Sequence, residues 1–212
     1  MEREAGEAAM AGEAARRKLT LDEFLAWDGP ERRYQLFDGE PVARPLETGA
    51  HGTLQARLGA SLIAALAGRE PCRPVSEAGV ASVRRARDVY VADIAVTCAP
   101  DRRGARLTEA PLLLVEILSE STAEEVRKLK LPEYRLIPSV REVLLLDSRD
   151  TYAEVHRRLD ETRWLTDLVV GPDGVLRLES VPLEVRLADL YRGLDLPGAS
   201  PATAEDAGPA GA

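Results

Sequence analysis

Two acidic residues interrupt apolar segments that have the length of β-strands. Asp93 lies within Val-Tyr-Val-Ala-Asp-Ile-Ala-Val at 89–96, and Glu116 within Leu-Leu-Leu-Val-Glu-Ile-Leu at 112–118. An ionised carboxylate loses several kcal/mol of hydration on burial unless a cation or hydrogen bonds replace the water. If the two strands are neighbours, the carboxylates also repel each other and raise at least one pKa. A divalent ion removes both costs, and two carboxylates suit Mg²⁺, which keeps several waters for chemistry.

The alternative is that each carboxylate sits at a strand end or pairs with one of the many arginines. A Ser/Thr-rich stretch at 119–122 follows the second strand, and a helical pattern runs from Ser121 or Thr122 to about Leu136. Lys130 lies two turns into this helix, where it can lean back over the end of the Glu116 strand. A lysine there can orient or deprotonate a water and offset charge on a phosphorane. Position alone favours the alternative that Lys130 is a solvated helix lysine.

The rest of the pattern indicates the elements that must position these residues. A capping box at Thr20 to Glu23 predicts a short helix to about Trp27, and Asp38-Gly39 predicts a two-residue hairpin turn. The order of helix, several strands, helix and strand predicts an α/β or α+β fold with a mixed sheet flanked by helices. The other predicted elements are a helix at 52–67, strands at 33–37, 40–43, 75–83, 142–146 and 152–158, a last hairpin of 163–168 with 175–178, and a helix at 187–192.

Length and composition predict one domain. The chain has 212 residues, 45% hydrophobic and 30% charged, which is ordinary for a globular protein. We expect one domain at 19–196, with disordered polar tails at 1–18 and 197–212. The net charge of −8 argues against a protein that coats nucleic acid generally, but it allows a local basic cleft.

The cysteines and the hydropathy pattern bear on the compartment. Cys72 and Cys98 have no CxxC spacing, so we expect neither a disulfide framework nor a zinc site, and a reducing cytoplasm fits. No segment approaches the ~20 apolar residues that cross a bilayer. Residues 1–18 lack the apolar core of a signal peptide, so secretion is not expected.

Several short segments, in order, are similar to one known family. Together they resemble the Uma-type family of predicted restriction endonucleases, a bacterial group with the restriction-endonuclease-like PD-(D/E)XK fold. The resemblance runs from about Leu19 to Leu194. The matching segments are Leu-Thr-Leu-Asp-Glu-Phe-Leu at 19–25, Tyr-Gln-Leu-Phe-Asp-Gly-Glu at 34–40, His51, Ala-Asp-Ile at 92–94, Val-Glu-Ile-Leu-Ser-Glu-Ser-Thr at 115–122, Lys130 with Tyr134, and Val-Arg-Glu-Val-Leu-Leu-Leu-Asp at 140–147.

The resemblance implies an enzyme that hydrolyses phosphodiester bonds of DNA with Mg²⁺, or with Mn²⁺ in its place. Asp93 and Glu116 would hold the metal together with the backbone carbonyl of Ile117, and Lys130 would position the attacking water. In this family the lysine stands on the helix rather than on the strand, which explains why Leu118 occupies the position of the lysine in a plain Glu-x-Lys. The alternative is a catalytically silent module of the same fold that binds nucleic acid or protein.

Accessory positions and departures follow from the same resemblance. His51 is a candidate substrate or supporting contact, or else a solvated histidine at a helix start. Tyr134 either braces Lys130 or packs the helix. Gln35 stands where the family usually has a glutamate that assists metal or water binding. Pro132 should kink the Lys130 helix, because it removes a hydrogen bond and pushes Leu131 away from helical angles.

DNA is the expected partner, with RNA left open, and no membrane partner is expected. Phosphate contacts need cationic side chains. The candidate clusters are Arg84-Arg85-Arg87, Arg102-Arg103-Arg106 and Arg157-Arg158, each of which is otherwise a solvated loop. A homodimer is expected by analogy, since nucleases of this fold often pair to cut two strands.

Overall fold

The computed structural model describes residues 18–27, 34–44 and 46–196. The tails predicted at 1–18 and 197–212 lie outside the described residues, apart from Lys18. The described part forms an eight-stranded mixed sheet with the order β2-β1-β4-β5-β6-β7-β8, and β3 pairs with β4 off this path. The strands are β1 Tyr34–Phe37, β2 Glu40–Ala43, β3 Arg73–Ala81, β4 Val89–Thr97, β5 Pro111–Leu118, β6 Glu142–Asp147, β7 Tyr152–Arg158 and β8 Trp164–Val170. The predicted fold class is confirmed.

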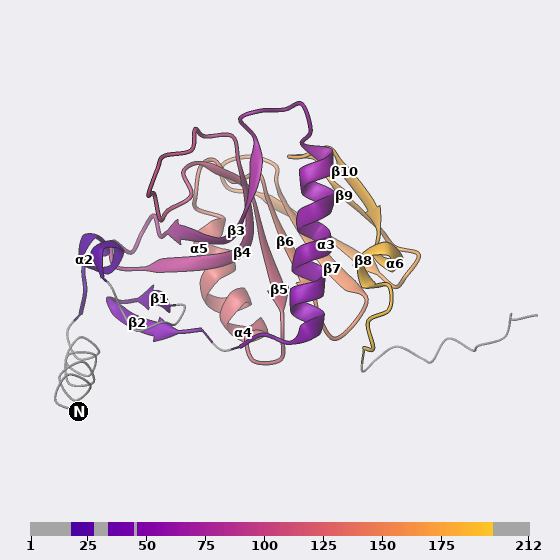
Figure 1. The fold of residues 1–212 in the computed structure, drawn as a ribbon, viewed down its shortest axis with the longest axis horizontal. Coiled ribbons are helices and arrows are strands. Elements are labelled where there is room, and N and C mark those ends of the chain that lie inside the picture. The colour runs from indigo at the N-terminus through magenta and orange to yellow at the C-terminus, as the bar shows by residue number, and fades with distance from the viewer. Residues whose placement is uncertain (1–17, 28–33, 45, 197–212) are drawn as a thin grey trace, which may run out of the picture.

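Helices cover both faces of this sheet (Figure 1). On one face lies α3, Gly49–Ala65, where Leu54, Leu58 and Leu62 repeat every four residues and are fully buried. On the other face the chain forms α4 (Ala123–Glu125), a π-helical turn η1 (Val126–Lys130) and α5 (Leu131–Tyr134). Burying a leucine side chain stabilises the fold by about 1.5–3 kcal/mol, so α3 is fixed mainly by its apolar stripe.

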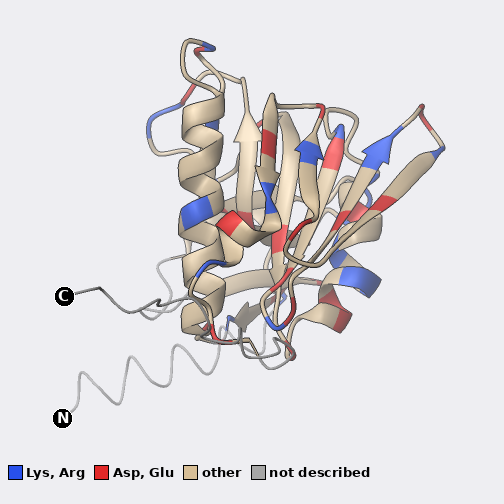
Figure 2. Ribbon diagram, turned by 90° about the vertical axis from the view of Figure 1, so that its right-hand side faces the viewer, with Lys and Arg blue, Asp and Glu red and all other residues tan. Residues whose placement is uncertain are grey.

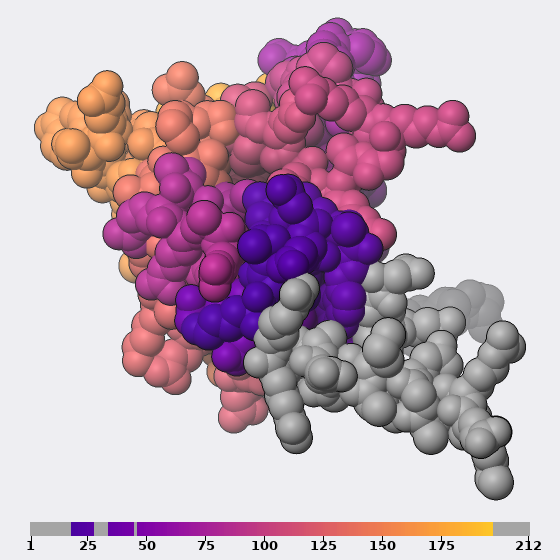
Figure 3. Space-filling view, turned by 90° about the vertical axis from the view of Figure 1, so that its left-hand side faces the viewer, coloured from indigo at the N-terminus to yellow at the C-terminus, as the bar shows by residue number. Residues whose placement is uncertain are grey.

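The N-terminal elements pack against the start of β4. Helix α2, Leu21–Ala26, begins with the predicted capping box of Thr20 and Glu23. The β1–β2 hairpin turns at Asp38 and Gly39 with positive φ values of 47° and 80°, as a primed two-residue turn requires. In the space-filling view these indigo elements lie against two segments, the magenta one that precedes β4 and the pink one that follows it (Figure 3).

Strand β4 has an unusual second edge. On its first edge β3 pairs with it from Val89 to Thr97. On its second edge β1 meets it at Val89, whereas β5 meets it from Ile94 to Thr97. The two partners therefore leave a gap in the pairing between Val89 and Ile94, and the backbone groups in that gap need other partners.

The predicted last hairpin is wrong. β8 pairs with β7 at the edge of the sheet, whereas β9 (Val175–Leu178) pairs with β10 (Leu183–Arg186) in a separate two-stranded sheet. The turn at 171–174 carries the chain out of the main sheet. Leu176 and Leu178 are then buried in the core between the sheet and α3, beside the short helix α6, Leu187–Tyr191. Burial of Leu176 and Leu178 against this face stabilises the observed arrangement more than the predicted hairpin. The periodicity of the sequence does not show which face a strand will cover.

The expectation of no disulfide is also wrong. Cys72 and Cys98 form a disulfide that joins the start of β3 to the residue after β4. The two cysteines are 26 residues apart in the sequence, and only the antiparallel pairing of β3 with β4 brings them together. In the described residues, no helix is both long enough and apolar enough to span a membrane.

Candidate active site

The site forms at the gap in the second edge of β4. The Val91 N–H donates to the Gln35 side-chain oxygen at 3.0 Å, and the Val91 carbonyl accepts from Lys130 Nζ at 3.0 Å. Two side chains thus take the place of the missing strand. Because the Val91 carbonyl needs a hydrogen-bond donor, it helps to hold the Lys130 side chain, which comes from η1, against the sheet.

Asp93 and Glu116 lie on the two strands that meet at this gap. The β4–β5 register pairs Ile94 with Val115, and one further step places Asp93 opposite Glu116. The backbone N–H of Ile117 donates to Asp93 Oδ2 at 2.7 Å, which ties the aspartate to β5. Asp93 is 1% and Glu116 2% exposed, so both carboxylates are buried side by side, as the sequence pattern predicted.

Glu116 is held by two residues of the helical segment. Lys130 Nζ donates to its carboxylate oxygens at 3.2 and 3.1 Å, and the Tyr134 hydroxyl donates to Oε1 at 2.6 Å. Burial raises the pKa of Glu116 to about 7, even though Lys130 and Tyr134 both act to lower it. Lys130 leans over the Glu116 strand as predicted, and it is buried rather than solvated.

Asp93 has different partners. Its Oδ1 accepts from Arg44 Nη2 at 2.9 Å, and its Oδ2 lies 3.2 Å from His51 Nε2. Burial acts to raise the pKa of Asp93, but the hydrogen bond and charge of His51, the Ile117 N–H and Arg44 outweigh it and lower that pKa. The alternative of a carboxylate paired with an arginine therefore holds for Asp93, whereas Glu116 pairs with a lysine.

The expected kink at Pro132 does not displace Lys130 from Glu116. The chain makes a π-helical turn over Val126–Lys130, in which the Leu131 N–H bonds to the Val126 carbonyl. The widened turn lets Pro132 fall in the first turn of α5, where its missing N–H costs little. Leu131 keeps helical angles of −56° and −45°, so the expectation that proline displaces it is wrong.

The three accessory residues also reach the site. His51 is buried beside Asp93 rather than solvated, and Tyr134 is fully buried with its hydroxyl on Glu116. Gln35 binds the Val91 N–H through its oxygen, and its amide nitrogen donates to Glu125 at 3.3 Å. Gln35 is thus a bridge in the hydrogen-bonding network.

Sequence reasoning missed three residues that complete the surroundings of Asp93. Arg44 bridges Asp93 and Glu77, and Gln55 donates to the Asp93 carbonyl at 2.8 Å and to Glu77 at 3.2 Å. Glu77 has a positive φ of 51°, and the β3–β4 register skips it between Ser76 and Ala78. None of the three belongs to a motif. Only the amphipathic period of α3, which places Gln55 one turn after His51, offers a signal.

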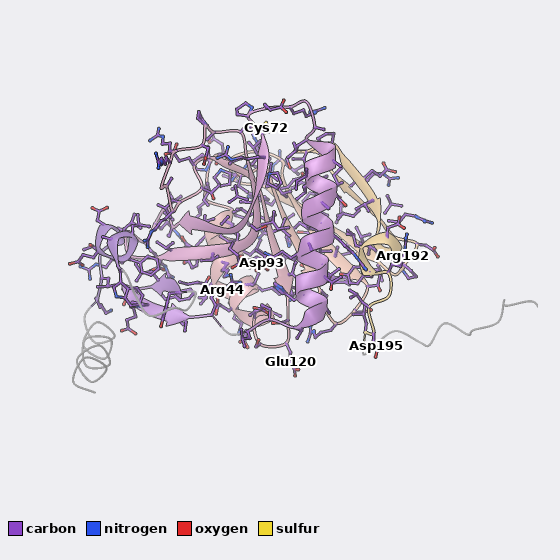
Figure 4. The ribbon with its side chains drawn as sticks, viewed as in Figure 1. Arg44, Cys72, Asp93, Glu120, Arg192 and Asp195 are labelled. Carbon is purple, nitrogen blue, oxygen red and sulfur yellow. A yellow bond between two sulfur atoms is a disulfide. The ribbon has the colours of Figure 1, made fainter. Side chains whose placement is uncertain are left out.

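A small cavity of about 40 Å³ opens between these side chains. The carboxylates of Glu47, Asp93, Glu116 and Glu125 line it, together with the cations Arg44 and Lys130. Four carboxylates and the His51 imidazole thus face two cations in this cavity. In Figure 4, Arg44 and Asp93 lie close together and well away from Cys72, which directly precedes β3.

A divalent cation fits this donor set in charge and in chemistry. Hard ions such as Mg²⁺ take oxygen ligands and bind through one or two carboxylates while keeping several waters. Among the described residues, no three His, Cys, Asp or Glu side chains stand close enough to hold a metal together. Of the oxygen donors that line the cavity, Asp93, Glu116 and the Ile117 carbonyl lie on the two strands that meet at the gap.

Each of the predicted basic clusters contains an arginine that is paired with a carboxylate. Arg84 pairs with Glu133, Arg102 with Glu109, and Arg157 with Glu142. Figure 2 shows basic and acidic positions side by side along the strands rather than a continuous basic face. Arg84, Arg102 and Arg157 therefore take part in intramolecular ion pairs.

The comparisons with known proteins agree with this fold. The profile of the Uma2 family, described as "Putative restriction endonuclease", matches residues 21–189, and the chain belongs to this family. The chain is 28% identical over 179 residues to the "Uncharacterized protein slr1290" of Synechocystis sp. (strain ATCC 27184 / PCC 6803 / Kazusa), covering 84% of this chain and 93% of that protein.

A solved structure shows the same architecture. It is titled as the crystal structure of "a putative nuclease belonging to DUF820" from Anabaena variabilis ATCC 29413. The two share 22% sequence identity with a TM-score of 0.66, over 82% of this chain and 97% of that one. At this identity the likeness concerns the fold, and function must be argued from the site.

Proposed function

We propose that this protein is a Mg²⁺-dependent endonuclease that hydrolyses phosphodiester bonds of DNA. The observation that carries the proposal is the pair of buried carboxylates, Asp93 and Glu116, on adjacent strands, with the Lys130 ammonium on Glu116. The family description supports nuclease chemistry, and the four carboxylates that line the cavity support a divalent cation. DNA as substrate comes from the restriction-endonuclease resemblance.

Each residue has a distinct role in this proposal. Asp93, Glu116 and the Ile117 carbonyl bind the ion, which when bound supplies Lewis-acid stabilisation of negative charge at the phosphate. Lys130 donates to the Val91 carbonyl and to both oxygens of Glu116, and it can orient the attacking water when one of its three donors turns from Glu116 to that water. Tyr134 fixes the Glu116 carboxylate by its 2.6 Å hydrogen bond. His51 orients Asp93 through its contact with Oδ2 at 3.2 Å.

One observation favours a second candidate function. The oxygens of Asp93 are already occupied by Arg44, His51 and the Ile117 N–H, as in a closed structural network. A protein in which Asp93 always keeps these partners would be a catalytically silent module that binds nucleic acid or protein without hydrolysing a phosphodiester bond. Metal binding separates the two candidates.

A plasmid-nicking assay tests the proposal. Wild-type protein is incubated with supercoiled plasmid and Mg²⁺ or Mn²⁺ beside Glu116→Ala, Lys130→Ala and the matched control Lys128→Ala. Lys128 lies two residues from Lys130 but is exposed and pairs with Glu124. We expect nicking by wild type and Lys128→Ala, and a loss of about 10²-fold or more in the two site variants, since each removes a group acting on the transition state.

Other outcomes lead elsewhere. Nicking that persists unchanged in both site variants would indicate a contaminant and reject this site. If wild type does not nick, melting temperatures measured with and without Mg²⁺ decide. A rise with Mg²⁺ indicates a degenerate metal site, whereas no rise with intact DNA binding indicates the silent module.

A further inference from the structure

Arg44 occupies a special position among the carboxylates of the site. It directly follows β2, and its side chain is only 8% exposed. Its guanidinium bonds to Asp93 on β4 and to Glu77 on β3, and its charge also acts on Glu116. One cation thus links the acidic groups of two adjacent strands.

The carboxylates do not depend on Arg44 for their positions. Asp93 is held by the Ile117 N–H at 2.7 Å and by His51, and Glu77 is held by Gln55 at 3.2 Å. Gln55 also binds the Asp93 carbonyl, so the two acidic residues share a support from α3. What Arg44 adds is its positive charge, on the Asp93 oxygen that the other groups leave open.

We propose that Arg44 is a built-in counter-cation that competes with the divalent ion for Asp93. The inference rests on the proposed function, because the ion is the one assigned there to Asp93 and Glu116. A guanidinium on Asp93 Oδ1 and an ion on the same carboxylate would place like charges within a few ångström in a poorly hydrated site, which is strongly unfavourable. The ion therefore binds only when the Arg44 side chain has left.

Calorimetric titration with Mn²⁺ tests this competition directly. Wild type is compared with Arg44→Met, which keeps a long side chain without charge, and with Arg44→Lys, which keeps the charge but loses the planar fork. If Arg44 closes the site in more than ~90% of wild-type molecules, the Arg44→Met variant should bind Mn²⁺ about tenfold more tightly or better. Arg44→Lys should fall between the two.

A matched control is Arg57→Met. Arg57 lies on α3, is half-buried, and donates to the Leu190 carbonyl away from the site. Its removal should leave Mn²⁺ affinity unchanged. Affinity of Arg44→Met within about twofold of wild type, with both proteins folded, would overturn the inference and leave the proposed metal site standing. No Mn²⁺ binding by any variant would instead reject the metal site itself, and the inference with it.

A measurement on wild type covers the case in which Arg44→Met fails to fold. Phenylglyoxal modifies exposed guanidinium groups, and peptide mass analysis locates the adducts. We expect Arg44 to react several-fold faster with saturating Mg²⁺ than without it, while Arg57 reacts at the same rate in both. Equal or slower modification of Arg44 in Mg²⁺ would show that the side chain stays in place, and would contradict the competition.

Discussion

Lys130 and Glu116 form an ion pair in which the ammonium lies 3.1 Å from the carboxylate and the two side chains are 3% and 2% exposed. Each charge is tolerable only because the other is present. The pair also joins the helical segment after β5 to the sheet, so a functional interaction is at the same time a structural one.

Removing one partner of this pair should be costly. We expect Lys130→Met to lower the free energy of unfolding by about 1–3 kcal/mol, because the Val91 carbonyl loses its hydrogen bond and Glu116, whose pKa is already raised to about 7 and rises further without the ammonium, must be buried as the protonated acid. Urea unfolding near neutral pH measures it. Lys128→Met, which breaks an exposed pair, should cost less than about 1 kcal/mol. Adding Glu116→Gln to Lys130→Met should recover part of the loss, and no recovery would contradict the assignment.

Glu133 should make stability depend on pH. It is buried and accepts from the Ser82 hydroxyl at 2.7 Å and from Arg84, and these contacts outweigh burial and lower its pKa below the ordinary 4.5. A lowered folded-state pKa contributes stability that is present above the unfolded value and lost as pH falls through the folded value. Glu133→Gln should therefore destabilise by about 1–3 kcal/mol at neutral pH and less in acid.

Denaturant titrations from neutral pH down to about pH 3 measure this difference. Glu124→Gln serves as the control, because Glu124 is exposed and its partner Lys128 is exposed too. A wild-type advantage over Glu133→Gln that grows on acidification would contradict the prediction.

Gln35→Glu should change the balance between the metal-free and metal-bound states. Without metal, the new carboxylate faces Glu125, to which the amide now donates at 3.3 Å, so the melting temperature should fall. With Mg²⁺ the added negative charge should enlarge the rise in melting temperature. The double variant Gln35→Glu with Glu125→Gln restores the hydrogen bond with exchanged partners, and it should regain metal-free stability. If it does not, the Gln35–Glu125 contact is not the cause.

The disulfide should contribute to stability under oxidising conditions. Replacing both Cys72 and Cys98 with serine should lower the free energy of unfolding by about 2–4 kcal/mol, because the closed loop no longer restricts the unfolded chain. Thermal unfolding with and without a reductant measures it. Reductant should bring wild type down to the level of the double variant and leave the variant unchanged. A reductant-insensitive wild type would show that the bond does not form.

The elements that the sequence predicts well are those whose pattern is local. The Thr20 capping box, the Asp38-Gly39 turn and the leucine stripe of α3 each depend on residues within a few positions of one another, and all three are present. The sequence also identifies Asp93 and Glu116 from a local pattern, because each is an acidic residue within an apolar strand.

The rest depends on contacts that no local pattern records. Arg44 reaches Asp93 across 49 positions, and Gln55 reaches it across 38. The pairing of β9 with β10 and the disulfide likewise depend on which elements the tertiary fold brings together. The π-helical turn before Pro132 is a compromise between a helix-breaking residue and the need to bring Lys130 over Glu116, and propensity alone favours a kink.

The gap along β4 has a mechanical consequence. The β1–β2 hairpin is tied near its turn, where the Gly39 N–H meets the Arg87 carbonyl at 3.0 Å, and joins β4 through the single registered pair of Leu36 with Val89. Its other end, which leads to Arg44, has no registered pair with β4 and is held there by two side-chain contacts, Gln35 on the Val91 N–H and Arg44 on Asp93. We therefore expect this end of the hairpin to separate from β4 more readily than the fully paired strands do, and amide exchange at Val91 would measure it.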